Sequence, residues 1–257
     1  MQRRFRNLAA LTCGVMIIGA GALSAQKPKS PKEVQAIQAV QAAQTPDDRI
    51  KAIENVLTNF ADTEFKVLLL QMAMQSEQQK GDYAQTIFYA QRLLDADPKN
   101  PVAMVTLAAE TARHTREFDL DKDEKLAKAD KWAKDGIEAA KTAPKPRPDY
   151  PDQQWEEARK DFQSQGYEAL GMSATLRKKY DEAVTDYKQA VTVTASPDPA
   201  TYVRLGQAYE DAGKLDDAND AFDKALNAPN ALPQIKSIAQ QKKQEIAKRK
   251  GGGAPAQ

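Results

Sequence analysis

The segment with the clearest capacity for chemistry is DLDKDE, residues Asp119–Glu124. Its alternating acids have the spacing that opens a calcium-binding loop, in which carboxylate oxygens ligate the ion. However, Glu124 stands where such a loop needs a glycine for its sharp turn, and Asp130 replaces the bidentate glutamate at the far end. The favoured interpretation is therefore an acidic helix start, which the helix dipole stabilises.

Side chains for nucleophilic or metal chemistry are scarce. His114 is the single histidine and Cys13 the single cysteine. One histidine cannot form a multi-histidine metal site, and no nucleophile–base pair, phosphate loop or dinucleotide fingerprint is visible. We predict no catalytic, cofactor or metal site, and a protein that is not an enzyme. The alternative from another class is a carboxylate-dependent enzyme that uses the insertion His114–Leu126.

Composition narrows the choice of partner. The 257 residues are 41% hydrophobic and 28% charged, as in a soluble globular protein, with a net charge of +1. No large electrostatic field would attract nucleic acid, so we predict no nucleic-acid partner.

The N-terminus has the order of a secretory signal peptide. A basic opening, MQRRFRN, precedes the uncharged apolar run Leu8–Leu23 and the small residues of GALSAQ. We predict export with cleavage after Ala25, which places the mature protein in the periplasm or outside a bacterial cell. The alternative is an uncleaved anchor helix, the one case in which we expect membrane contact. Lipidation of Cys13 is disfavoured because Ala10 stands where a lipoprotein signal has leucine.

A repeat fills much of the remaining chain. In Thr201–Leu226 the pattern is aromatic-x2-Leu-Gly-x2-Tyr followed by Ala-x3-Phe, carried by Tyr202, Leu205, Gly206, Tyr209, Ala218 and Phe222. Shifted back by 35 residues, it recurs as Tyr167, Leu170, Gly171, Ala174, Ala183 and Tyr187. The stretch Gly81–Asn100 repeats the second half of the pattern, and Glu33–Lys66 repeats it weakly.

This pattern resembles the tetratricopeptide repeat (TPR) family in period and signature. The resemblance is strong over residues 164–232, good over 67–100 and weak over 33–66, with a divergent unit at 101–141. It implies an all-α superhelix of antiparallel helix pairs. Packing considerations support the same architecture. Glycine and alanine permit two helices to cross closely, and one helix pair cannot bury its apolar face unless further pairs stack on it.

Helix start signals and prolines divide the chain. Ser-Pro, Thr-Pro, Asn-Pro and Asp-Pro pairs mark helix starts at 30–31, 45–46, 100–101 and 198–199. We predict a signal peptide (1–25), a linker (26–32), N-terminal TPR-like units (33–141), a proline-rich linker between the two halves (142–152), C-terminal TPR units (153–232), a capping helix (233–250) and a disordered tail (251–257). The basic residues of the capping helix are interpreted as solvating it, with contact to anionic lipid or polymer as the alternative.

The resemblance also implies where a partner binds. In this family the first helix of each pair lines a concave groove that takes peptides or partner helices. The lysine and asparagine that clamp a C-terminal carboxylate in some relatives are replaced here by Val203 and Gln207. The predicted partner-binding groove residues are Gln71, Gln75, Gln78, Gln79, Gln165, Glu168, Met172, Val203, Gln207 and Glu210.

We therefore expect a non-catalytic exported TPR scaffold that mediates protein–protein interaction in the bacterial cell envelope. The alternative among binding proteins is a membrane-attached factor for envelope or outer-membrane assembly. The sequence leaves open the identity of the partner, the pathway and the oligomeric state.

Overall fold

The computed structural model describes residues 27–251, and every regular element in this range is an α-helix, which confirms the predicted all-α class. The predicted signal peptide and residues 252–257 of the predicted tail lie outside the described residues. None of the described helices is long and apolar enough to cross a bilayer. The helices are α1 (Pro31–Ala42), α2 (Pro46–Asn59), α3 (Lys66–Lys80), α4 (Tyr83–Ala96), α5 (Pro101–His114), α6 (Lys122–Thr142), α7 (Asp152–Leu176), α8 (Tyr180–Val193), α9 (Pro199–Asp211), α10 (Leu215–Asn227) and α11 (Pro233–Gly251).

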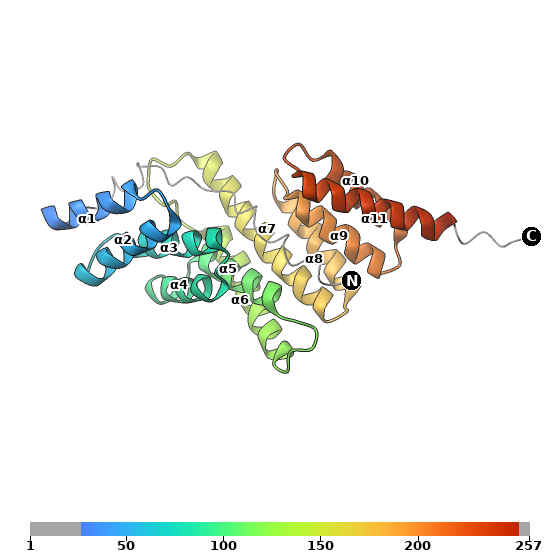
Figure 1. The fold of residues 1–257 in the computed structure, drawn as a ribbon, viewed down its shortest axis with the longest axis horizontal. Helices are drawn as coiled ribbons and strands as arrows, with labels where there is room; N and C mark the ends of the chain where they lie inside the picture. Colours follow the sequence, from blue (N-terminus) through green and yellow to red (C-terminus); the bar gives the residue numbers. More distant parts are fainter. Residues whose placement is uncertain (1–26, 252–257) are drawn as a thin grey trace, which may run out of the picture.

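The helices form an elongated array in which consecutive elements pack together from α1 at one end to α11 at the other (Figure 1). Five antiparallel pairs, α1–α2 to α9–α10, follow one another, and α11 packs on the last pair. The second helix of each pair also packs on the first helix of the next. This nearest-neighbour packing is what gives a repeat protein a continuous core.

The predicted helix starts are confirmed in atomic detail. Each of four helices has proline in its first turn and a polar side chain that accepts a hydrogen bond from the first-turn backbone, which would otherwise lack a partner. The donor–acceptor pairs are Glu33 N to Ser30 Oγ (3.1 Å), Asp48 N to Thr45 Oγ1 (3.1 Å), Ala103 N to Asn100 Oδ1 (3.1 Å) and Ala200 N to Asp198 Oδ1 (2.9 Å).

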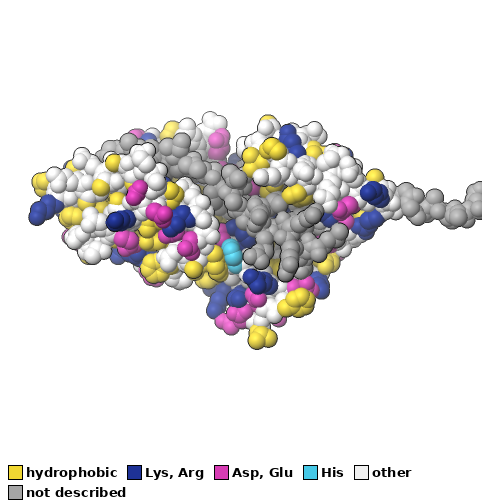
Figure 2. Space-filling view, viewed as in Figure 1, with side chains coloured by type: hydrophobic (Ala, Val, Ile, Leu, Met, Phe, Trp, Pro, Cys, Tyr) yellow, Lys and Arg dark blue, Asp and Glu magenta, His cyan; other side chains and the backbone are white. Residues whose placement is uncertain are grey.

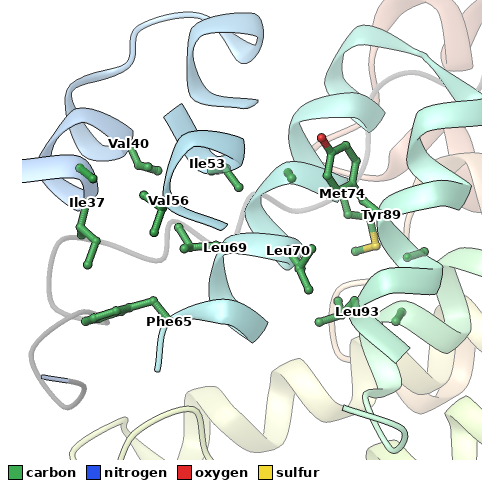
Figure 3. Close-up of a cluster of buried hydrophobic side chains, with 14 of the residues drawn as sticks. Ile37, Val40, Ile53, Val56, Phe65, Leu69, Leu70, Met74, Tyr89 and Leu93 are labelled. Carbon is green, nitrogen blue, oxygen red and sulfur yellow. The ribbon is translucent and has the colours of Figure 1, made fainter. Parts of the chain in front are cut away.

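The N-terminal core interleaves aliphatic side chains from five helices, α1 to α5. Ile53 and Val56 of α2 are fully buried and face Leu69 and Leu70 of α3 (Figure 3). Tyr89 of α4 belongs to the same cluster and lies next to Met74, on the side of α3 away from α2. The core therefore includes the unit over residues 33–66, in which the repeat signature is weakest.

Small residues stand where helices cross, as the repeat pattern predicts. A Cβ atom added to Gly206 of α9 would lie 2.6 Å from Cε1 of Phe222 on α10. At Gly171 of α7 it would lie 2.7 Å from Cε1 of Tyr187 on α8. The side chain of Ala218, on the α10 side of the crossing, is fully buried. Helix spacing in these two pairs is therefore set by residues that leave room for an aromatic ring.

The proline-rich segment 142–152 is anchored to its surroundings. The indole Nε1 of Trp155 donates to the carbonyl oxygen of Ala143 (2.9 Å), and Lys145 forms an ion pair with Asp152. Helix α7, which follows the segment, packs against α5 and α6 as well as α8. The units on the two sides of this linker consequently share one packed array.

Candidate functional site

Seven of the ten predicted groove residues lie on two first helices, α3 and α7, and the remaining three lie on α9. These helices belong to three different pairs, as the resemblance implies. In the structure the ten side chains fall into two groups. One group makes no polar contact within the protein, and the other is hydrogen-bonded, ion-paired or packed against other residues of the protein.

Helix α3 presents a row of glutamines at intervals of four residues. Gln71 and Gln75 are half-buried, and Gln79 is exposed. Within residues 27–251, the side chains of these three glutamines make no hydrogen bond, whereas Gln78 takes part in contacts within the protein. Residues four apart share a helix face, so the row offers adjacent amide groups to a ligand. An amide both donates and accepts, which matches the groups of a peptide backbone.

The end of α3 beside this row is fixed by charge. Lys80 Nζ lies 2.8 Å from Asp47 Oδ1 and 3.0 Å from Glu77 Oε2. Hydrogen bonding to Asp47, and then to Glu77, raises the pKa of Lys80 to about 12. The lysine therefore stays charged throughout the physiological range and links α3 to the preceding pair.

On α7, the side chain of Glu168 binds residues of the next repeat. Its carboxylate forms an ion pair with Arg204 of α9 and accepts a hydrogen bond from Thr201 Oγ1 at 3.3 Å. Burial lowers the pKa of Arg204, but the charge of Glu168, together with Tyr187, Asp198 and the hydrogen bond to Glu168, raises the pKa above its usual value. Met172 packs against two apolar clusters. Gln165 is half-buried, and of the two polar residues among the three it alone makes no side-chain hydrogen bond within the described residues.

On α9 the predicted groove positions are largely used by the protein itself. Val203 is only 3% exposed and belongs to the core shared with α10 and α11, so the structure corrects its assignment to the groove surface. Gln207 Nε2 donates to Asp211 Oδ1 (3.1 Å). Glu210 accepts from Lys242 Nζ (3.2 Å) and Arg249 Nη1 (2.7 Å) of α11. The capping helix therefore occupies this end of the predicted surface.

The basic residues of α11 hold that helix on the last repeat. Besides the two bonds to Glu210, Lys243 pairs with Asp223 and Lys250 with Asp216, both of α10. Lys242 and Lys243 are mostly covered by these contacts. The interpretation that these charges solvate the helix is thus incomplete, because four of them bind carboxylates of the preceding pair.

The insertion between α5 and α6 forms an ordered loop over residues 115–121. Asp119 Oδ2 accepts from Arg116 N (3.1 Å) and Lys125 Nζ (3.1 Å), and Lys125 also pairs with Asp121 at 2.9 Å. Hydrogen bonding to the Arg116 backbone, and then to Lys125, lowers the pKa of Asp119. Two of the acids that suggested a calcium loop therefore bind a lysine. Among the described residues, no group of three or more His, Cys, Asp or Glu side chains is placed to hold a metal ion.

His114 lies beside this loop and is engaged by its neighbours. Its ring stacks on Tyr83 with centroids 4.0 Å apart, and Nδ1 lies 3.0 Å from the carbonyl oxygen of Glu110. Figure 2 shows the histidine on the molecular face in view, where acidic and basic side chains are interspersed. These contacts fix the ring at the end of α5.

Two surface features were not predicted from the sequence. Phe118 is 86% exposed and Leu120 fully exposed at the tip of the insertion. A cleft of about 690 Å³ lies between α6 and α8, with α7 as its floor, and holds the carboxylate of Asp186. An amphipathic pattern cannot show either feature, because both depend on how neighbouring pairs stack.

Comparisons with known proteins agree with this architecture. Residues 199–231, which include α9 and α10, match the family model described as Tetratricopeptide repeat. No curated protein sequence matches the chain. The crystal structure of MamA protein is similar with a TM-score of 0.52 and 16% identity, over 88% of this chain and 97% of that one. The thermophilic TPR protein TTC0263 of Thermus thermophilus is similar with a TM-score of 0.55 and 16% identity, over 81% of this chain and 95% of that one.

One tetratricopeptide repeat thus lies at residues 199–231, and the chain as a whole shares the fold of these two structures, an all-α superhelix of stacked helix pairs.

Proposed function

We propose that this protein is an exported, non-catalytic scaffold of a bacterial cell envelope that binds a protein or peptide partner on the face formed by its first helices. Export is supported by the basic and then apolar order of the first 25 residues. The interaction role is supported by the repeat fold, which presents a long continuous surface.

One observation supports a partner-binding site on α3. Gln71, Gln75 and Gln79 form a row on α3 with no hydrogen bond from their side chains among the described residues. By contrast, Glu168 and Glu210 are bound to cationic side chains of the following helices. The N-terminal part of the face consequently has polar groups available to a ligand, whereas the C-terminal part is covered by contacts within the chain.

The chemistry of the row favours an extended or helical peptide with polar groups. Amide side chains spaced along one helix face can pair with successive backbone or side-chain groups of a bound segment. No charge on the row selects the sign of the ligand. Specificity would then come from the shape of the face and from a few anchoring contacts.

Affinity capture from envelope extracts of the native host tests this proposal. The triple variant Gln71→Ala, Gln75→Ala and Gln79→Ala should lose most of the captured partner while keeping its helicity. The matched control replaces three exposed glutamines of second helices, Gln85, Gln91 and Gln189, with alanine. Equal capture by the two variants would refute the placement on α3, and direct binding to the purified partner would quantify the loss.

A further inference from the structure

A cleft on another part of the array has the features of a separate binding site. Asp130 and Lys134 of α6 line one side, and Thr185 and Asp186 of α8 line the other. Leu170 and Ala174 of α7, and Arg177 directly after the end of α7, form the floor. The walls are thus second helices of consecutive pairs, so the cleft is distinct from the row on α3.

Most charges around this cleft are already neutralised. Arg177 Nη1 lies 2.9 Å from Asp130 Oδ2, and Lys179 Nζ lies 3.0 Å from Glu182 Oε1. Asp181, at the start of α8, pairs with Lys214 at 2.7 Å. The pairing leaves one carboxylate, that of Asp186, and one ammonium, that of Lys134.

Asp186 is the polar group that this environment leaves least satisfied. It is partly buried, and within residues 27–251 its side chain makes no hydrogen bond or ion pair. Burial raises the pKa of Asp186 to about 6, and the negative charges of Asp130 and Glu182 add to that effect while Lys134 opposes it. A carboxylate in such a setting gains stability when a cation approaches it.

We propose that the cleft between α6 and α8 binds an arginine side chain of a partner protein, with the guanidinium on the Asp186 carboxylate. A guanidinium forms two parallel hydrogen bonds to a carboxylate, which satisfies both of its oxygens. The aliphatic part of the arginine lies along Leu170, the half-buried apolar residue of α7 that lines the cleft. Thr185, at the wall, offers a hydroxyl oxygen to a remaining N–H of the guanidinium.

Lys134 is the intramolecular competitor for this site. It is exposed on α6, so its ammonium stays hydrated and its charge is screened at the surface. A bound guanidinium would displace it from the vicinity of Asp186. Removing Lys134 should therefore strengthen arginine binding, whereas a structural ion pair between Lys134 and Asp186 would leave no site for an external cation.

The test uses ¹⁵N-labelled full-length protein titrated with the peptide acetyl-Gly-Arg-Gly-amide, and with the same peptide carrying citrulline, which is neutral and nearly isosteric. We expect saturable shifts of the amide signals of Leu170, Thr185 and Asp186 with the arginine peptide only. Asp186→Asn should weaken binding roughly tenfold or more, and Lys134→Ala should strengthen it. Asp220→Asn on α10, the same change at an exposed aspartate outside the cleft, is the control and should leave affinity unchanged.

The pH dependence adds an independent readout. Affinity for the arginine peptide should rise roughly tenfold between pH 5 and pH 7.5, because Asp186 ionises in this interval. The rise should vanish in Asp186→Asn. Equal binding of the citrulline peptide, undiminished binding by a folded Asp186→Asn variant, or shifts located away from the cleft would each overturn the proposal.

Discussion

Gly206 of α9 lies directly against the ring of Phe222 of α10, so that a Cβ on the glycine would come within 2.6 Å of Cε1 and 2.8 Å of Cδ1. Phe222 is fully buried, which prevents its ring from moving aside without displacing other core residues. The Gly and the following Phe of the repeat signature therefore form one packing unit. Its role is structural.

This contact predicts the cost of Gly206→Ala. A helical glycine normally gains about 1 kcal/mol when replaced by alanine. Here overpacking, which costs about 1–3 kcal/mol, should outweigh that gain and lower the free energy of unfolding. Chemical denaturation measures the change. In a Phe222→Leu background, Gly206→Ala should lower the free energy of unfolding by less. An equal decrease in both backgrounds would show that the Phe222 ring is not the cause.

Ala218→Leu should also destabilise the last pair. The side chain of Ala218 is fully buried, so leucine overpacks the core at a cost of about 1–3 kcal/mol. Asp216→Ala should cost less than about 0.5 kcal/mol, because Asp216 is 95% exposed and its ion pair with Lys250 is screened by solvent. Chemical denaturation measures the free energy of unfolding of both variants. Equally small decreases would contradict the close packing of Ala218 in the α9–α10 pair.

Glu210→Gln should loosen the capping helix. The substitution removes the negative charge that holds Lys242 and Arg249, at a cost on the order of 1 kcal/mol, since Arg249 is half exposed. Amide hydrogen exchange should increase in α11 and remain unchanged in α3. Lys248→Ala, an exposed change in the same helix, serves as the control. Unchanged protection of α11 in the Glu210 variant would rule out this anchoring role.

Asp186 should make stability fall as pH rises. Its pKa in the folded protein is about 6, above the value of about 3.9 in an unfolded chain, so the folded state binds more protons between these values. The free energy of unfolding therefore decreases from pH 4 to pH 6 by an amount on the order of 1 kcal/mol, after allowance for solvent screening. Asp186→Asn should remove this decrease. A variant whose pH profile between 4 and 6 matches the wild type would disprove the assignment.

Export predicts removal of the first 25 residues or so. Mass determination on protein purified from a native host gives the length of the mature chain directly. We expect a chain that begins near Gln26. An intact N-terminus on protein from the cytoplasmic fraction would contradict export, and an intact N-terminus in the membrane fraction would indicate an anchor.

The sequence predicted the helices well because their signals are local. Proline after Ser30, Thr45, Asn100 or Asp198 marks a helix start, and each of these four side chains forms its cap. The small residues at helix crossings follow from the repeat spacing in the same way. Such features depend on a few neighbouring residues, so a linear pattern is sufficient to find them.

The surface was harder to predict because its contacts join different repeats. Glu168 binds Arg204 and Glu210 binds Arg249, partners 36 and 39 residues apart. Which charges meet depends on how adjacent pairs stack, and a single helix pattern does not contain that information. A signal was nevertheless present, since each glutamate has a cation about one repeat later. The cleft at Asp186 had no comparable signal, because three helices form it.

Binding of a partner on the first-helix face at α3 is tested most directly by photo-crosslinking in the native host. A photoreactive amino acid is placed at Gln75 on α3 or at Gln91 on α4. We predict a crosslinked adduct with another protein from position 75 and none from position 91. An adduct from position 91 alone would contradict this placement, because binding would then occur on the second helices.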